Sequence, residues 1–238
     1  MSKKLDHRFW AKYFKVYDVL NMVIPYQELL GSIINELDIK KGDLVLDAGC
    51  GTGNLAVKMK TKGAKVIGID NCIEALDIYK EKDKQAEILV HDLTMPLPFP
   101  DGFFDKIASN NVLYTISKAN RQAVYKELKR VLKPGGLLVV ANIQKDFKPL
   151  NIYKDHLKQD LSVNGYFRLM IKIVKMSFPT IKMFYYNSII KSNNKSGFYN
   201  FIEKGEEAKD LEGHGFKILS ELPVYSQQAF LTTSKKNV

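Results

Sequence analysis

The sequence predicts an α/β protein in which short buried strands alternate with amphipathic helices. Its clearest strand is the apolar run 44–46, which ends at Asp47. A glycine-rich turn at 49–53 follows, and a helical pattern begins at Asn54. Strand, turn and helix start together form half of a nucleotide-binding βαβ unit, and the same alternation continues downstream.

The remaining elements follow from apolar periodicity and from turn residues. The expected helices cover 7–39 with an interruption at Pro25, then 54–63, 72–82, 118–132 and 203–213. The expected strands cover 65–70, 86–91, 103–110, 137–141, 215–220 and 229–233. A chain of 238 residues is long enough for one large α/β domain, or for one domain with an insertion.

Composition limits the class of protein and of partner. The chain is 45% hydrophobic and carries a net charge of 36 − 26 = +10, which fits a solvated lysine-rich surface, an anionic ligand or a membrane surface. Its two cysteines, Cys50 and Cys72, suggest no disulfide framework and fit a reducing, cytoplasmic location. We expect no metal site, no signal peptide and no membrane span, because the sequence has no CxxC or His/Cys cluster, no apolar leader and no apolar run near 18 residues.

Two kinds of ligand could bind the glycine turn. Gly51-x-Gly53-x-x-Ala56 fits a relaxed dinucleotide fingerprint, and Asp70 lies where a ribose-binding acid belongs. Asp47 disfavours a dinucleotide, because a carboxylate at the strand end repels a pyrophosphate. The same carboxylate suits a ligand that carries an ammonium and a sulfonium group.

The stretch Val45-Leu-Asp-Ala-Gly-Cys-Gly-Thr-Gly resembles the first motif of the class I S-adenosylmethionine-dependent methyltransferases. Asp70, the pair Asp92-Leu93 and the strand that ends at Asn110 resemble the next three motifs, and Leu132-Lys-Pro-Gly-Gly is a common turn of the family. The chain is most similar to the small-molecule type, as in ubiquinone and menaquinone biosynthesis. This resemblance implies a Rossmann-like, seven-stranded, mostly parallel sheet with helices on both faces, an antiparallel last strand and a helical cap insertion.

The resemblance also implies S-adenosylmethionine as the cofactor and assigns residues to its parts. Asp70 would accept from the ribose hydroxyls, Asp92 and Leu93 would meet the adenine, and Asn110 would lie beneath the methionine part. The residues expected to bind the cofactor are Asp47, Ala48, Gly49, Cys50, Gly51, Asn54, Asp70, Asn71, Cys72, Asp92, Leu93 and Asn110.

We expect four segments: an N-terminal helical lid at 1–41, a cofactor-binding core at 42–143, a basic helical cap at 144–202 and a C-terminal part at 203–238. Trp10 and Tyr17 in the first segment either close over the cofactor or pack against the sheet. In the cap, an apolar stripe around Phe167 and Phe178 is predicted on a helix that ends at Pro179. Three interpretations of this cap stay open: an apolar cover over the pocket with solvated lysines, a basic site for an anionic acceptor, or a peripheral membrane contact.

The sequence thus predicts transfer of a methyl group to a small, fairly apolar or anionic acceptor. Nucleic acid is disfavoured as the acceptor, because Asn110 is not followed by the proline pair of the amino-methylating branches. The alternatives are a nicotinamide oxidoreductase and a cofactor-binding module without turnover. No catalytic residue is assigned; His156, His91, His214, Tyr17 and Tyr114 are weak candidates for a proton-transfer role.

Overall fold

The computed structural model describes residues 7–195 and 201–237 of the chain. The helices are α1 (His7–Tyr17), the 3-10 helix η1 (Asp18–Met22), α2 (Ile24–Leu37), α3 (Asn54–Thr61), α4 (Ile73–Lys82), the 3-10 helix η2 (Leu113–Thr115), α5 (Lys118–Val131), α6 (Pro149–Lys195) and α7 (Glu206–Gly213). The strands are β1 (Leu44–Ala48), β2 (Lys65–Asp70), β3 (Glu87–Val90), β4 (Phe104–Asn110), β5 (Leu132–Ile143), β6 (Phe216–Val224) and β7 (Ala229–Lys236).

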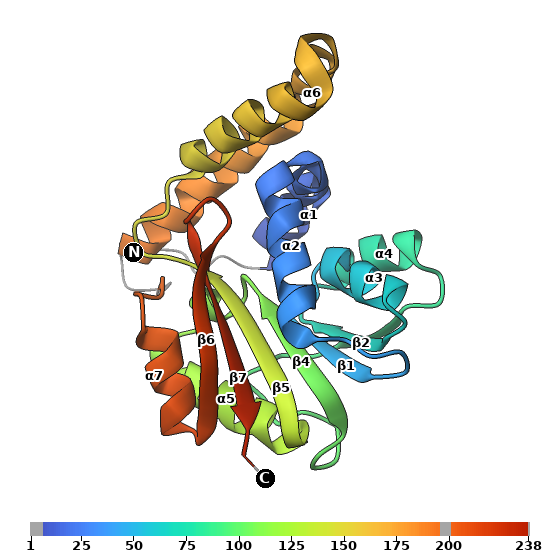
Figure 1. Ribbon diagram of the computed structural model, residues 1–238, viewed down its shortest axis with the longest axis vertical. Helices are drawn as coiled ribbons and strands as arrows, with labels where there is room; N and C mark the ends of the chain where they lie inside the picture. Colours follow the sequence, from blue (N-terminus) through green and yellow to red (C-terminus); the bar gives the residue numbers. More distant parts are fainter. Residues whose placement is uncertain (1–6, 196–200, 238) are drawn as a thin grey trace.

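The seven strands form one sheet in the order β3-β2-β1-β4-β5-β7-β6. All pairs from β3 to β5 are parallel, whereas β7 runs antiparallel to both β5 and β6 (Figure 1). Helix α2 crosses one face of the sheet, and α5 and α7 lie on the other side (Figure 1). The predicted Rossmann-like fold, with an antiparallel last strand, is therefore confirmed.

Helix α2 anchors the N-terminal segment to the sheet. Its apolar positions repeat at intervals of three and four, and Leu29, Leu30, Ile33 and Leu37 are fully buried in the core. Pro25 stands in the first turn of this helix, where its missing N–H leaves no hydrogen bond unmade. The predicted interruption at Pro25 thus marks the start of α2, and it places α1 and η1 beside the ends of the strands.

Strand register brings the sequence motifs to one edge of the sheet. Asp47 pairs with Gly68 of β2 and with Ala108 of β4, so the carboxyl ends of these neighbouring strands are level. Asp70 and Asn110 are the last residues of β2 and β4. Ligands of open α/β sheets bind at this edge, so the fold places two acids, Asp47 and Asp70, and the amide of Asn110 around one opening.

Helix α6 is a hairpin of two helical stretches that projects from the sheet (Figure 1). The chain reverses at Gly165, whose φ of 73° and ψ of 170° are not helical. The prediction that Pro179 ends a helix is wrong, because the second stretch continues through it. The helix is held by Leu169, Met176 and Met183, which are buried at intervals of seven residues on either side of the proline.

Candidate active site

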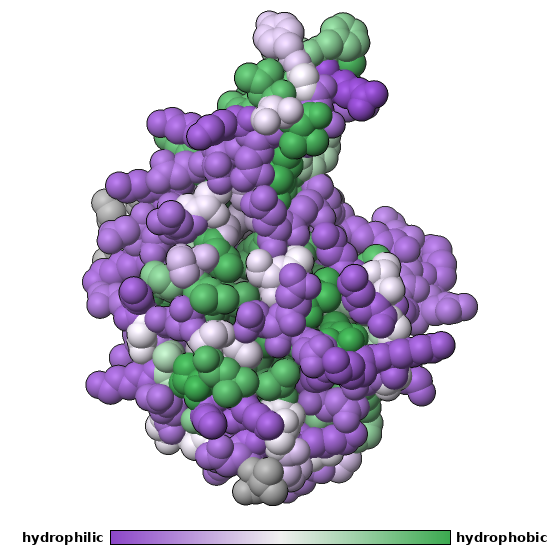
Figure 2. Space-filling model, in the orientation of Figure 1, coloured by the Kyte–Doolittle hydropathy of each residue, from purple (hydrophilic) through white to green (hydrophobic). Residues whose placement is uncertain are grey.

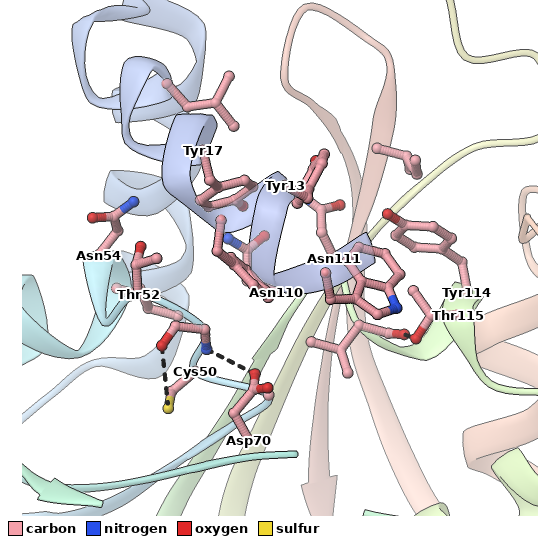
Figure 3. Close-up of a pocket in the computed structure, with 18 of the residues that line it drawn as sticks. Tyr13, Tyr17, Cys50, Thr52, Asn54, Asp70, Asn110, Asn111, Tyr114 and Thr115 are labelled. Carbon is pink, nitrogen blue, oxygen red and sulfur yellow. Dashed lines mark hydrogen bonds between the residues drawn. The ribbon is translucent and has the colours of Figure 1, made fainter. Parts of the chain in front are cut away.

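A cavity of about 810 Å³ opens at the carboxyl edge of the sheet (Figure 3). The strand ends and the glycine turn form one part of its wall, and α1, η1, α2, the segment 111–120 with η2, α6 and the β6–β7 turn contribute to the rest. Every residue expected to bind the cofactor lines this cavity except Ala48 and Cys72, which are buried behind it. The structure therefore brings together residues that are far apart in the sequence, such as Asp47 and Asn110, which are separated by 63 positions.

The glycine turn is tied to β2 through its backbone. The N–H groups of Gly49 and Cys50 both donate to the carbonyl of Ile69, at 2.8 and 2.9 Å. Gly49 has a φ of 81°, and a Cβ there would lie 2.3 Å from Cγ2 of Val112. Only glycine fits this backbone conformation and this close approach, so the turn keeps a fixed shape at the cavity wall.

Asp70 holds the same turn from its side chain. One carboxylate oxygen accepts from the N–H of Gly51 at 2.9 Å (Figure 3). The other accepts from the N–H of Cys72, also at 2.9 Å. Burial raises the pKa of this carboxyl group, and the backbone N–H groups of Cys72, Gly51 and Asn71 oppose that shift. Each oxygen keeps a second lone pair, so Asp70 can still accept from a ligand's hydroxyl groups.

Asp47 is 1% exposed, and its Oδ2 has no hydrogen-bond partner. Burial, together with the nearby charge of Asp70, raises the pKa of Asp47 to about 7. The Oδ1 atoms of Asn110 and Asn111 are also buried without partners. Three unsatisfied acceptors in one cavity wall are costly unless a ligand with several donors or a positive charge meets them.

The pair predicted to meet the adenine, Asp92 and Leu93, is partly engaged by the chain itself. Asp92 Oδ1 accepts from the N–H and the hydroxyl of Thr94, each at 2.8 Å, so this side chain stabilises its own turn. Asp92 and Leu93 both line the cavity, and the neighbouring His91 places Nε2 3.1 Å from the carbonyl oxygen of Pro96. One oxygen of Asp92 is thus left for a ligand.

Asn54 belongs to a polar network that joins the N-terminal segment to the glycine turn. Its amide donates to Asp18 at 3.1 Å and accepts from Asn21 at 2.8 Å and from Lys82 at 2.7 Å. Lys82 also forms an ion pair with Asp18 at 2.7 Å, and Thr52 donates to Asp18 at 2.8 Å. Thr52 lies within the glycine motif but was not among the predicted site residues. Asp18 and Lys82 were not predicted either, because no local motif connects their distant segments to this turn.

A second part of the cavity wall, which we call the aromatic end, is formed by aromatic rings; it reaches the glycine turn, since a Cβ at Gly51 would lie 3.1 Å from the Phe14 ring. Trp10, Tyr13, Phe14 and Tyr17 of α1 line it and contact one another edge-on or tilted. The rings of Tyr26, Phe147, Tyr153 and Tyr225 and the side chain of Met183 continue this wall. No lysine or arginine is among the described residues that line the cavity. This end suits an apolar ring rather than an anion.

The weak candidates for proton transfer separate by position. His156 is buried outside the cavity lining, and its Nδ1 accepts from the N–H of Ile24 at 3.3 Å. His214 also lies outside the lining, with Nδ1 2.8 Å from the carbonyl oxygen of Asp210. Tyr17 and Tyr114 line the cavity (Figure 3), and burial raises the pKa of Tyr17.

Both cysteines are free and buried, and no group of acids, histidines or cysteines that could hold a metal occurs among residues 7–195 and 201–237.

Comparison with known sequences gives one domain and a set of relatives. Residues 46–140 match a family described as a methyltransferase domain. A demethylmenaquinone methyltransferase of Staphylococcus aureus is 32% identical over 157 residues, which cover 63% of this chain and 64% of that protein. The chain therefore spans slightly less than two thirds of the length of the curated relatives it matches.

Comparison with solved structures gives the fold. A SAM-dependent methyltransferase from Aquifex aeolicus superposes with a TM-score of 0.59 at 19% identity, over 92% of each chain. A magnesium protoporphyrin IX methyltransferase from Synechocystis with bound SAH has a TM-score of 0.61 at 17% identity, over 92% of this chain and 87% of that one. The 4+2 cyclase SpnF has a TM-score of 0.62 at 16% identity, over 90% of this chain and 81% of that one.

Proposed function

We propose that this chain is a class I S-adenosylmethionine-dependent methyltransferase that transfers a methyl group to a small, apolar, ring-containing acceptor. The observation that carries the proposal is the contrast within one cavity. Its strand-end wall holds unsatisfied acceptor atoms of Asp47, Asn110 and Asn111, and its other wall is aromatic. A cationic donor and an apolar acceptor would each meet a matching surface there.

The chain's residues fit the donor in their chemistry. The buried acceptors of Asp47 and Asn110 would receive the ammonium and sulfonium end, and Asp70 would accept from the ribose. Asp92 and Leu93 would meet the adenine at the rim. When bound, S-adenosylmethionine supplies a methyl group already activated by a positively charged sulfur. The protein's part is then to align the acceptor with that methyl group and to exclude water.

The acceptor class rests on the aromatic end of the cavity. This end is surrounded by Tyr13, Tyr26, Tyr153 and Tyr225. Among the described residues that line the cavity there is no lysine or arginine that could bind an anion. The relative at 32% identity is named for demethylmenaquinone, which is an apolar ring compound. We therefore favour a hydroxylated aromatic or quinol ring over the anionic acceptor that the basic composition also allowed.

Two other functions remain to be separated from this one by experiment. A nicotinamide oxidoreductase would use the same glycine turn, but the buried Asp47 would stand beside the pyrophosphate. A cofactor-binding module without turnover is the second alternative, since a fold does not by itself fix an activity. The cytoplasmic location is part of the proposal, and two free cysteines support it.

Binding and turnover are tested separately. We expect S-adenosylhomocysteine at about 100 times its dissociation constant to stabilise the folded chain by about 2.7 kcal/mol, and NAD(H) to leave the melting temperature unchanged. Stabilisation by NAD(H) alone would refute the donor. Transfer of a labelled methyl group to a panel of quinols and phenols tests the reaction. Donor binding without transfer to any of them, or to a cell extract, would leave the binding module as the function.

A further inference from the structure

The α6 hairpin has two apolar faces, and only one of them packs on the protein. The inner face of its second stretch carries Leu169, Met176, Met183 and Ile190, which are buried. Met183 also lines the cavity, as does Asn187 one turn further along. The outer face carries the second set, which we call the outer stripe. The outer stripe consists of Phe167, Ile171, Val174, Phe178, Ile181 and Tyr185.

The outer stripe is exposed along its whole length. Phe167, Val174 and Phe178 are 77%, 70% and 67% exposed. Figure 2 shows hydrophobic side chains reaching the surface of the projecting arm. The cap meets the cavity with its inner face, through Met183, whereas no residue of the outer stripe lines the cavity. A contiguous exposed apolar face of this kind marks an interaction surface.

Positive charges border the outer stripe on one side. Arg168, Lys175 and Lys182 are exposed, and each follows a stripe residue by one position. The ammonium of Lys182 lies 4.4 Å from the ring centroid of Phe178, so charge and apolar surface share one face. No Asp or Glu occurs between Leu161 and Ile202. The surface offers apolar groups and cations together, without an anion among them.

We propose that the outer stripe and its basic border dock this protein on an anionic lipid bilayer, with the hairpin lying in the interface. Aromatic and aliphatic side chains would enter the acyl boundary while Arg168, Lys175 and Lys182 meet the lipid phosphates. None of the described helices is long and apolar enough to cross a membrane, so the contact is peripheral. The cavity lies against the opposite face of the same helix, next to the docked surface.

A second copy of the chain is the competing occupant. The stripe residues alternate at intervals of four and three, as in a coiled-coil seam. The charged residues that flank such a seam, Arg168, Lys175 and Lys182, are all positive. The segment 161–202 has no acid that could pair with them. Like charges across a seam disfavour self-association, whereas they strengthen attraction to anionic lipid.

Vesicle co-sedimentation of the full chain tests the surface. We expect the chain to sediment with vesicles of phosphatidylcholine and phosphatidylglycerol, to remain in solution with phosphatidylcholine alone, and to be released as salt is added. The variant Phe167→Ser/Phe178→Ser should bind anionic vesicles at least tenfold more weakly. Leu219→Ser/Leu222→Ser, on the exposed side of β6, is the matched control and should bind as the wild type does.

The charges are tested in the same way. Replacing Arg168, Lys175 and Lys182 by Gln should weaken binding at least tenfold, whereas replacing Lys204, Lys209 and Lys217 should change it by less than twofold. Failure of the wild type to sediment with anionic vesicles would overturn the proposal, and so would equal losses in both triple variants. A dimer in light scattering that Phe167→Ser/Phe178→Ser dissociates would assign the stripe to self-association instead. Stabilisation by S-adenosylhomocysteine, measured on each variant, reports the donor site independently.

Discussion

The two ends of the cavity differ in how their shapes are held. At the strand end, Gly49 and Cys50 are bonded to β2 through the backbone, and Asp70 holds the turn with both oxygens. At the aromatic end, side chains from α1, α2, α6 and the β6–β7 turn meet by ring packing, with few hydrogen bonds between them. Directional bonds fix the backbone at the first end, whereas the shape of the second end depends on which side chains pack there.

This difference suggests a division of labour. A donor that is the same in every reaction of a family needs a fixed site, whereas the acceptor can differ between members. Changes at the strand end should therefore damage folding or donor binding, and conservative changes at the aromatic end, which keep the ring, should leave both nearly intact. The following predictions test that contrast, beginning with the largest expected effect.

Replacing Gly49 by Ala should lower the free energy of unfolding by about 3 kcal/mol, because the left-handed backbone is strained and the new Cβ would overlap Val112. Urea denaturation measures the loss. The double variant Gly49→Ala/Val112→Ala should recover only the part of the unfolding free energy that is lost to overlap with Val112, and not the part lost to backbone strain. Gly31→Ala is the control, since nothing lies within 4 Å of a Cβ there. Equal effects at the two glycines would contradict a tightly fixed turn.

Replacing Asp70 by Ala should weaken S-adenosylhomocysteine binding by about 1–3 kcal/mol, the scale of hydrogen bonds to a charged acceptor. Titration calorimetry gives the dissociation constant directly. Asp77→Ala, an exposed acid on α4, serves as the control and should bind as the wild type does. An unchanged constant for Asp70→Ala would remove Asp70 from the donor site.

Donor binding should strengthen about tenfold between pH 6 and pH 8, because the buried Asp47, with its pKa raised to about 7, must lose its proton to meet a cationic ligand. The ligand-free chain should behave in the opposite sense. A carboxyl group with a raised pKa favours the folded state while it is protonated, and this contribution is lost as the pH rises from about 4 to 7. Calorimetry in buffers of different ionisation enthalpy should detect proton release. Asp47→Asn should abolish the pH dependence, and its persistence there would assign it to another group.

The polar network beneath α1 should contribute less. Lys82→Gln removes the ion pair with Asp18 and should cost about 0.5–1 kcal/mol of unfolding free energy, since both side chains are partly exposed. Lys80→Gln, exposed on the same helix, is the control. Thermal melts in low and high salt should bring the two variants together as salt is added. A salt-independent difference would mean that the packing of the lysine stem, rather than its charge, stabilises the contact.

The smallest effect is expected at the aromatic end. Tyr17→Phe should leave S-adenosylhomocysteine binding within about 0.5 kcal/mol and methyl transfer within several-fold, because burial raises the pKa of this hydroxyl and keeps it protonated at neutral pH. Steady-state kinetics with an accepted quinol would measure both values. A hundredfold loss of turnover with intact donor binding would give Tyr17 a direct part in the reaction.

Local patterns predicted the strand end well. A strand, its terminal acid and the following glycine turn occupy about ten consecutive residues, so Asp47 and Asp70 could be placed at one edge before the structure was known. The network of Asp18, Asn54 and Lys82 could not, because it joins three helical segments through tertiary packing. Asn54 was selected for the motif, and its amide is instead engaged by the chain itself.

Periodicity alone could not predict the direction of the α6 hairpin. Leu169, Met176 and Met183 recur every seven residues, and so do Phe167, Val174 and Ile181. Both sets are apolar and both have helical spacing, so only the fold shows that the first set is buried and the second exposed. The prediction that a helix ends at Pro179 failed for a related reason, since tertiary contacts on both sides of a proline can outweigh its local tendency to end a helix.

The ion pair between Asp18 and Lys82 has a kinetic consequence. Helix α1 forms one wall of the cavity, and Asp18 directly follows it. A spent donor that leaves through this wall requires α1 to move away, and this movement would separate Asp18 from Lys82. The dwell time of the spent donor should therefore shorten as ionic strength rises. On this route α1 and η1 would set how long the spent donor stays bound, in addition to forming part of the cavity wall.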